Sequence, residues 1–181
     1  MIRAILTTLG LFVLASFAGI GCVLFVFYKY GQALPDYRQL ADYEPPVMTR
    51  VHAGDGRLLA EFAMEKRVFI PIKAMPKQLI NAFLAAEDKN FYTHPGVDFM
   101  GIGRAVLTNV KNIGSSRRLV GASTITQQVA KNFLLTNEVS WTRKIKEAIL
   151  AFRIERAIPK SRILELYLNE IYLGFGSYGA G

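Results

Sequence analysis

The chain has 181 residues, a formal net charge of +8 at pH 7 and 51% hydrophobic residues. Within these residues there is room for one domain of ordinary size and an appendage, which excludes an assembly of several large domains. Cys22 is the only cysteine, so a disulfide within the chain is excluded as well. Residues 1–30 contribute only Arg3 and Lys29 to the charge, so +6 remains on the rest, an excess that suits anionic lipid headgroups, phosphorylated ligands or nucleic acid.

Residues 1–30 are predicted to form a transmembrane anchor. No charged residue lies between Arg3 and Lys29, and about 25 helical residues exceed the roughly 30 Å hydrocarbon core of a bilayer. A cleaved signal peptide is the alternative, but its apolar region is normally about 7–15 residues long. Basic residues on both sides leave the orientation undecided. A tethered domain favours lipid or phosphorylated ligands, and we expect no nucleic-acid partner.

The next segments are predicted to be a linker and a hairpin. Residues 31–46 contain Gly and Pro among polar residues, which is typical of a juxtamembrane linker. Alternation over 47–51 and a second apolar run over 58–62, separated by a glycine-bearing turn, predict a β-hairpin. A third short strand is expected at 67–70.

Helical periodicity follows from residue 76 onward. Pro76 suits the first helical position, Ser161 suits the cap of the last helix, and Gly174 suits its end. A basic loop is expected at 111–120. The helices are predicted at residues 76–87, 97–110, 124–135, 141–157 and 161–173. Their buried faces are expected to contain Leu79, Ile80, Phe83 and Leu84 in the first, Ile125, Val129 and Phe133 in the third, and Ile163, Leu164, Tyr167, Leu168 and Ile171 in the last. The domain at 47–181 is therefore mainly α with a small sheet at its entry.

Two adjacent carboxylates, Glu87 and Asp88, end the first apolar helical stripe. A carboxylate at the boundary of core and cleft suits a general base or acid, and Asp88 beside it suits a cation. The alternative is a pair of solvated acids at a helix end. This alternative is disfavoured because Phe91, His94 and Gly96 follow at short offsets.

A polar block at 121–131 opens the helix predicted at 124–135. Thr124 and Gln127 match a capping box, so part of the block serves to start the helix. Thr124, Gln127, Gln128 and Lys131 are predicted to share a polar face that receives phosphate or sugar oxygens at the helix N-terminus.

Arg143 and Glu147 are four residues apart and face the same way on the next helix. One interpretation is a surface ion pair worth about 0.3–0.5 kcal/mol. The other interpretation is a functional site that needs a second carboxylate and a fixed cation. Spacing alone does not decide between the two interpretations.

In this order the motifs resemble glycosyltransferase family 51, the peptidoglycan glycosyltransferases, which occur in class A penicillin-binding proteins and in monofunctional relatives. The resemblance covers nearly the whole chain. The matching residues are Glu87, Asp88, Phe91, His94 and Gly96 in the first motif, Gly121 to Gln128 with Lys131 and Asn132 in the second, Arg143, Lys144 and Glu147 in the third, and Lys160, Ile163 to Glu165 and Tyr167 to Asn169 in the fourth.

The resemblance implies a lysozyme-like helical fold and polymerisation of lipid II into β-1,4 glycan strands by an inverting mechanism. Glu87 is then the general base, and Glu147 is the second catalytic carboxylate, which orients cations or lies beside the donor pyrophosphate. The leaving group is undecaprenyl pyrophosphate, whose charge Lys131, Arg143 and Lys144 would stabilise. Substrate-binding positions are expected at Asp88, Phe91, His94, Ser123, Thr124, Gln127 and Gln128.

Further expectations concern cofactors, partners and location. The resemblance leaves room for a divalent cation, magnesium or manganese, but the sequence names no ligand cluster. Lipid II, the growing glycan chain, membrane lipid and other cell-wall synthesis proteins are the expected partners. The resemblance implies a single-pass protein of the bacterial cytoplasmic (inner) membrane, with its catalytic domain on the outer or periplasmic face.

The chain ends at 174–181, where the fifth motif of the family has only begun, and contains no Ser-x-x-Lys acylation motif. We therefore expect a C-terminally incomplete glycosyltransferase domain that does not itself bind penicillin. A monofunctional glycosyltransferase, a lysozyme-like glycan-cleaving enzyme and an inactive membrane tether for cell-wall proteins remain as alternatives.

Overall fold

The structure is a computed structural model that describes residues 2–32, 34–43, 49–62, 69–115, 117–136, 140–174 and 177–180. Within these ranges it has six α-helices, two short 3₁₀ turns and two antiparallel two-stranded sheets. The helices are α1 (Ile2–Gly31), α2 (Lys77–Glu87), α3 (Phe99–Lys111), α4 (Ile125–Leu134), α5 (Trp141–Ala157) and α6 (Lys160–Glu170). The strands are β1 (Thr49–His52), β2 (Leu58–Phe62), β3 (Tyr172–Gly174) and β4 (Ser177–Tyr178), and the 3₁₀ turns are Arg38–Leu40 and Ile72–Ala74.

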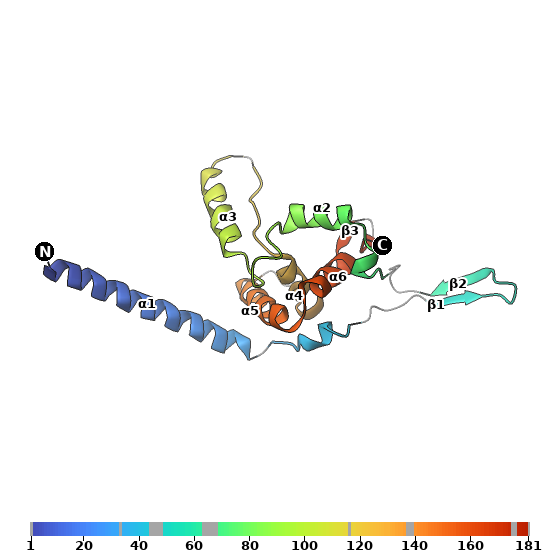
Figure 1. The fold of residues 1–181 in the computed structure, drawn as a ribbon, viewed down its shortest axis with the longest axis horizontal. Coiled ribbons are helices and arrows are strands. Elements are labelled where there is room, and N and C mark those ends of the chain that lie inside the picture. Colours follow the sequence, from blue (N-terminus) through green and yellow to red (C-terminus); the bar gives the residue numbers. More distant parts are fainter. Residues whose placement is uncertain are drawn as a thin grey trace.

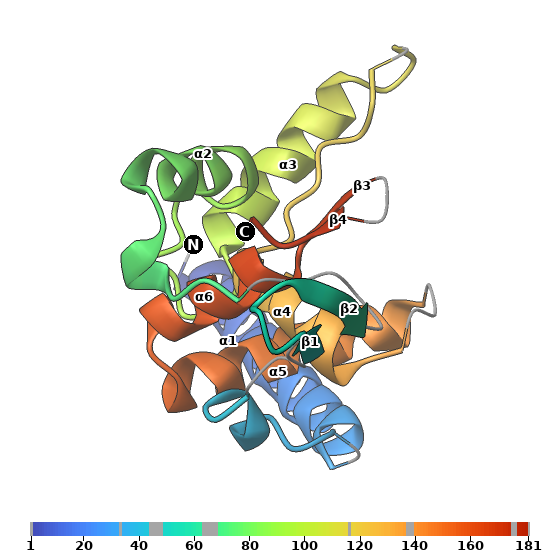
Figure 2. The same ribbon diagram turned by 90° about the vertical axis from the view of Figure 1, so that its right-hand side faces the viewer.

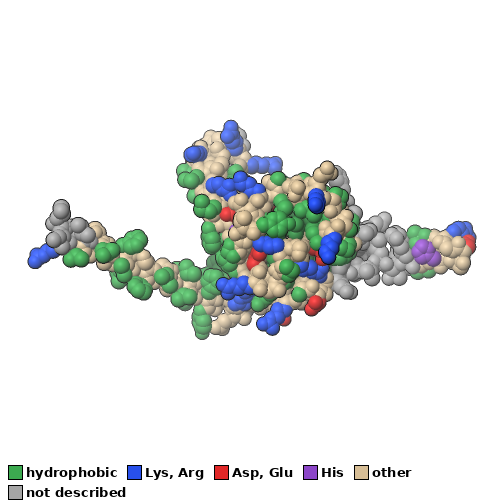
Figure 3. Space-filling model, viewed as in Figure 1, with side chains coloured by type: hydrophobic (Ala, Val, Ile, Leu, Met, Phe, Trp, Pro, Cys, Tyr) green, Lys and Arg blue, Asp and Glu red, His purple; other side chains and the backbone are tan. Residues whose placement is uncertain are grey.

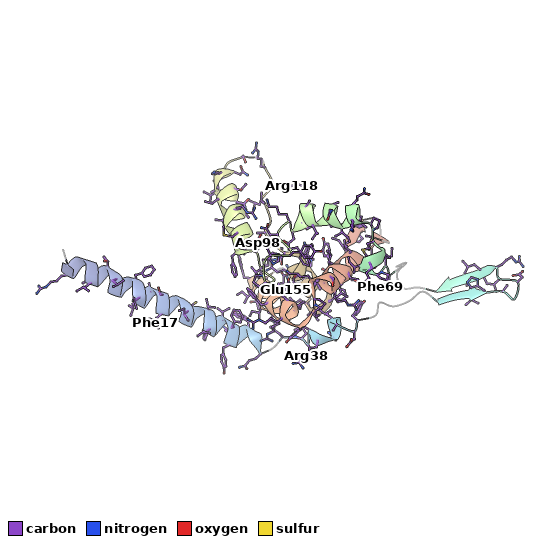
Figure 4. All side chains as sticks on the ribbon, in the orientation of Figure 1. Phe17, Arg38, Phe69, Asp98, Arg118 and Glu155 are labelled. Carbon is purple, nitrogen blue, oxygen red and sulfur yellow. The ribbon has the colours of Figure 1, made fainter. Side chains whose placement is uncertain are left out.

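A helical body formed by α2 to α6 has α1 extending from one end and the β1–β2 hairpin from the other (Figure 1). Most of the described side chains of α1 are exposed, Phe17 among them (Figure 4). Its segment Leu6–Gly31 is long and apolar enough to cross a membrane. The Arg153 guanidinium donates to the carbonyl oxygen of Gly31 at 3.1 Å, which joins the end of α1 to α5.

The core lies between α4, α5 and α6, with α4 packed against the other two (Figure 2). The predicted apolar faces of α4 and α6 are confirmed, because Ile125, Val129, Ile163 and Leu164 are all buried. Leu40 joins this core from the segment predicted to be a linker. Burial of these stripes is the main stabilising contribution that positions the three helices.

The polar side of α6 holds the segments on either side of the hairpin. Asn169 accepts from the Ile70 amide and donates to the Ile70 carbonyl, both at 2.9 Å. Arg162 donates to the Tyr43 carbonyl at 2.6 Å. These bonds attach Ile70 and Tyr43 to α6. The predicted strands and turn of the hairpin are confirmed by the pairing of β1 with β2.

The ends of the last helix differ from the prediction. It begins at Lys160 after Pro159, so Ser161 lies inside the first turn and does not cap it. It ends at Glu170, because the chain extends at Ile171 to form the β3–β4 hairpin, and Gly174 lies in β3. The Gly179 and Ala180 amides donate to the carbonyls of Ile171 and Leu168, which satisfies acceptors near the helix end.

Three further predictions need correction or fall outside the described residues. The apolar face of α2 is only partly buried, since this helix lies over the core and not within it, and Pro76 precedes the helix as its cap. Of the strand expected at 67–70, residues 67 and 68 lie outside the described residues, and Phe69 and Ile70 are not in a strand. For Phe99, Met100, Ile102 and Val106 the sequence leaves core packing and insertion into a membrane equally open. In α3 only Ala105 is buried, so these residues do not form a core stripe.

Candidate active site

Glu87 is the last residue of α2, and its side chain is exposed. Its Oε2 accepts a hydrogen bond from Gln128 Nε2 of α4 at 2.9 Å. The helix ends here because Asp88 leaves the helical conformation and turns its carboxylate inward. The two adjacent acids therefore have different surroundings, one in solvent and the other in the protein.

Asp88 joins the end of α2 to the start of α4. Its buried carboxylate lies 2.9 Å from His94 Nε2 and accepts from the Ile125 amide at 3.0 Å. The Gly96 amide donates to His94 Nδ1 at 3.1 Å, so the ring proton lies on Nε2 and is donated to Asp88. A carboxylate at a helix N-terminus is favoured by the helix dipole. This burial gives Asp88 and His94 a positioning role, although Asp88 also lies in the wall of a cavity; their predicted contact with substrate stays a prediction.

Gly96 and Phe91 complete this junction by close packing. Gly96 has φ of 104°, and a Cβ atom there would meet the Ala151 backbone at 2.7 Å. Its carbonyl accepts from the Thr124 hydroxyl at 2.6 Å. Phe91 is fully buried, with Lys160 Nζ 4.4 Å from its ring centroid. Phe91 therefore packs in the core and makes a cation–π interaction, and its predicted contact with substrate stays a prediction.

The polar block at the start of α4 divides into two parts. Thr124 and Gln127 form the predicted capping box and are buried, so their hydrogen-bonding groups serve mainly to start the helix. Gln128 and Lys131 are only partly buried and line a cavity, to which the buried Gln127 also contributes. No hydrogen bond or ion pair joins Lys131 to another residue in the described part of the chain.

Glu147 lies one turn beyond Arg143 and Lys144 near the start of α5, which Ser140 caps. Its side chain is 2% exposed, with Arg143 Nε 3.1 Å from Oε1 and Lys144 Nζ 2.7 Å from Oε2. The interpretation as a surface ion pair is therefore wrong, because a buried carboxylate needs such partners. Lys144 also donates to the Ser123 hydroxyl at 2.7 Å, which brings the loop before α4 to the same place.

These side chains surround a cavity of about 540 Å³, here called the cationic cavity. Its charged lining residues are Glu87, Lys131, Arg143, Lys144 and Glu147. A second cavity of about 290 Å³ has Glu87 as part of its wall and extends towards α3. Glu87 therefore lies where two cavities meet, and one of them has an excess of positive charge.

The second cavity contains residues to which the sequence drew no attention. Asp98, Arg104 and Lys89 contribute its charged lining together with the two adjacent acids. Asp98 lies at the lower end of α3 in Figure 4, and Arg118 lies at the far end of the loop that follows this helix. An aspartate directly before an apolar helix is a cap signal, which would have identified Asp98. Arg104 has no such signal, because only the fold brings it to the cavity.

The described residues contain no group of three or more His, Cys, Asp or Glu side chains that could hold a metal ion. The divalent cation considered from the sequence therefore has no assigned ligands, and it stays a prediction.

An exposed carboxylate, two glutamine amides and three cations line one cavity of a mainly helical body, an arrangement that suits an oxygen-rich, anionic ligand. The family model described as Transglycosylase matches residues 55–181. The chain therefore belongs to the transglycosylase family, and the family resemblance of its motifs is confirmed. This membership supports the predicted class of enzyme.

Similar proteins agree with this assignment. The chain is 55% identical over 179 residues to penicillin-binding protein 1A of Rickettsia conorii, covering 99% of the chain and 23% of that protein. It is 44% identical to penicillin-binding protein 1A of Aquifex aeolicus, covering 99% of the chain and 24% of that protein. The predicted anchor, the hairpin and the order of the motifs also indicate a likeness to penicillin-binding protein 1A. The chain thus spans about a quarter of the length of these relatives.

Proposed function

We propose that the chain is the membrane-anchored glycosyltransferase region of a protein that polymerises lipid II into β-1,4 glycan strands. The observation that carries this proposal is the exposed carboxylate of Glu87 at the edge of the cationic cavity. Lipid II is a disaccharide-peptide on undecaprenyl pyrophosphate, so it supplies a sugar hydroxyl for the base and a diphosphate for the cations. Family membership supports the same chemistry.

Glu87 accepts the proton of the acceptor hydroxyl in this reaction. The acceptor oxygen bonds to the anomeric carbon of the growing chain while the bond from that carbon to the pyrophosphate oxygen breaks. The bonding electrons leave with undecaprenyl pyrophosphate. Direct displacement turns an α-linked donor into a β-linked product, so no covalent glycosyl-enzyme is required.

The cations of the cavity stabilise the charge that develops on the leaving group. Lys131 is uncommitted within the described residues, and it is the candidate for direct contact with the diphosphate. Arg143 and Lys144 are held by Glu147 through ion pairs of 3.1 and 2.7 Å. Glu147 therefore orients these cations, which is one of the two roles expected of it.

Glycan cleavage in the lysozyme manner is the second candidate, because it also uses carboxylates on a helical fold. That chemistry requires two carboxylates that act on the glycosidic bond. Glu147 is buried between two cations, which favours transfer over cleavage. Incubation with purified glycan strands separates these functions, since a cleaving enzyme shortens them and a synthase does not.

The anchor gives the proposed reaction a physical advantage. A lipid-borne substrate confined to a bilayer meets a tethered domain at raised effective concentration. We place the protein in the bacterial cytoplasmic membrane as a single-pass protein, with the helical body on the outer or periplasmic face. Other cell-wall synthesis proteins are the proposed partners, and a tether without activity would bind them while making no glycan.

The test is Glu87→Gln in the intact protein supplied with lipid II. Loss of the general base should lower the rate of polymerisation by about 10²–10⁴-fold, while the melting temperature stays unchanged because the side chain is exposed. Asp42→Asn is the matched control, an exposed acid-to-amide change that leaves activity intact. Polymerisation at a near-normal rate by Glu87→Gln would show that the base is assigned wrongly.

A further inference from the structure

The hydroxyl of Tyr167 is buried without a hydrogen-bond partner in the described part of the chain. Tyr167 belongs to α6 and is 1% exposed. A buried hydroxyl normally has a partner, because leaving it unpaired costs free energy of folding. The packing of the ring alone would be served equally well by phenylalanine, so the hydroxyl calls for an explanation.

The fold places this phenol next to the end of α2. The Tyr167 ring packs edge-on against Phe83, with the centroids 6.1 Å apart and the planes at 80°. Phe83 and Glu87 are four residues apart in α2, and residues at this spacing share one face of a helix. A ring on Phe83 therefore lies beside the turn that carries Glu87.

Electrostatics agree with this placement. Burial raises the pKa of the Tyr167 phenol above its usual range, and the negative charge of Glu87 raises it further. Both causes disfavour the phenolate. The group consequently stays protonated at working pH, and it can act as a hydrogen-bond donor towards a carboxylate.

Glu87 has an acceptor position to receive such a donor. Its Oε2 is held by Gln128, and no residue in the described part of the chain donates to Oε1. Because the side chain is exposed, a change of rotamer moves the carboxylate at small cost. A single hydrogen bond leaves the carboxylate free to rotate, whereas a second one would fix its direction.

We propose that Tyr167 is a positioning residue that donates a hydrogen bond to the Glu87 carboxylate, directly or across one water, and holds it together with Gln128. This inference rests on the proposed function, in which Glu87 is the base. The phenol acts through Glu87 and does not touch substrate. Other charged groups around the same carboxylate are Asp88, Lys89, Asp98, Arg104, Lys131, Arg143, Lys144 and Glu147.

The experiment compares Tyr167→Phe with the wild type in the intact protein, with lipid II as substrate. A lost donor lets the base swing away, so we expect kcat to fall about tenfold or more with KM little changed. A donor favours the charged carboxylate, so its loss should move the acid limb of the pH–rate profile upward. The surrounding charged groups are the same in both proteins, so a difference between the two pH–rate profiles comes from the loss of the phenol hydroxyl. The melting temperature should change little, because the variant keeps the packing of the buried ring and Glu87 is exposed.

Tyr92→Phe is the matched control, since Tyr92 is 60% exposed and its ring packs on Phe91. This variant should keep the wild-type rate and pH profile. An unchanged rate and profile in Tyr167→Phe would overturn the inference. So would a lower melting temperature with a lower rate and an unmoved profile, because that pattern describes a structural residue.

A second measurement separates this inference from the proposed function. If the wild type makes no glycan, the proposed function fails and the kinetic comparison has no signal. The Tyr167 hydroxyl proton is buried and is assigned in NMR spectra by its disappearance in Tyr167→Phe. It should move upfield in Glu87→Gln as the charged acceptor is removed, and an unmoved resonance would overturn the positioning role.

Discussion

Asp98 connects three segments through one carboxylate. It caps α3 by accepting from the Gly101 amide at 2.8 Å, and it accepts from Asn90 Nδ2 at 2.8 Å. Arg104 lies 3.5 Å from the same group. The Gly101 amide, opposed by partial burial and assisted by Asn90 and Arg104, lowers the pKa of this carboxyl. The start of α3 is thus tied to the loop that follows Glu87.

This capping bond predicts a pH-dependent stability of α3. Asp98→Ala should destabilise the helix by about 1 kcal/mol, measured by hydrogen exchange of its amides. The folded pKa lies below the unfolded value of about 3.9, so the stabilisation is complete above that pH and is lost as the pH falls through the folded pKa. The difference between wild type and variant should therefore shrink below about pH 4. Asp98→Asn keeps an acceptor and should lose less, and a difference independent of pH would contradict the assignment.

At this scale the sequence located residues that the fold brings to one cavity, but it could not assign their surroundings. Glu87 lies at the expected boundary of core and cleft, with Lys131, Arg143 and Glu147 around the same cavity. The burial of Asp88, Phe91 and His94 could not be predicted, because their partners come from α4, α5 and α6. A motif states which residue types occur together, whereas their burial depends on contacts between distant segments.

At the scale of elements, the Asp88 junction determines where α2 ends relative to α4. Its carboxylate serves His94 from the following loop and the first amide of α4 at once. Since Glu87 precedes Asp88 directly, the same junction sets the position of the proposed base. The helix boundaries on both sides were predicted within a few residues from capping and periodicity, but this bond between them was not.

Removal of the junction should cost more stability than removal of an ordinary surface acid. Asp88→Ala leaves His94 and the Ile125 amide unpaired, and we expect a loss of about 3 kcal/mol in the free energy of unfolding, measured in urea. Asp88→Asn retains an acceptor for the amide and should lose clearly less. Lys89→Ala, an exposed neighbour, is the control and should change stability by less than about 0.5 kcal/mol. Equal losses for the two Asp88 variants would contradict a hydrogen-bonded junction.

On the scale of the whole molecule, two apolar surfaces lie outside the core. One is α1, and Figure 3 shows hydrophobic side chains along its length. The other is α3, where Phe99 and Met100 are 65% and 77% exposed and Val106 and Leu107 are also exposed. Core packing of α3 was an alternative from the sequence, and this exposure contradicts it. Lys111, Arg117 and Arg118 add positive charge near the far end of the helix.

The arrangement of these surfaces was beyond sequence reasoning, although each segment was identified. Periodicity predicted an apolar helix near Phe99 and an apolar anchor before Lys29. It could not decide whether α3 faces the core, since a stripe of the same composition suits protein or lipid. Only the packing of α4 against α5 and α6, which completes the core without α3, settles that question.

We expect the α3 surface to bind a bilayer independently of α1. In the protein shortened by residues 1–32, Phe99→Asp with Met100→Asp should weaken binding to vesicles of anionic lipid by at least about tenfold. Each apolar side chain contributes about 1.5–3 kcal/mol when buried. Binding of the parent should also fall with salt, since lysine and arginine near the α3 loop contact the headgroups. Leu59→Asp in the hairpin is the control, an equally exposed apolar residue away from α3. Sedimentation with vesicles measures both effects, and undiminished binding by the double variant would contradict a membrane role for α3.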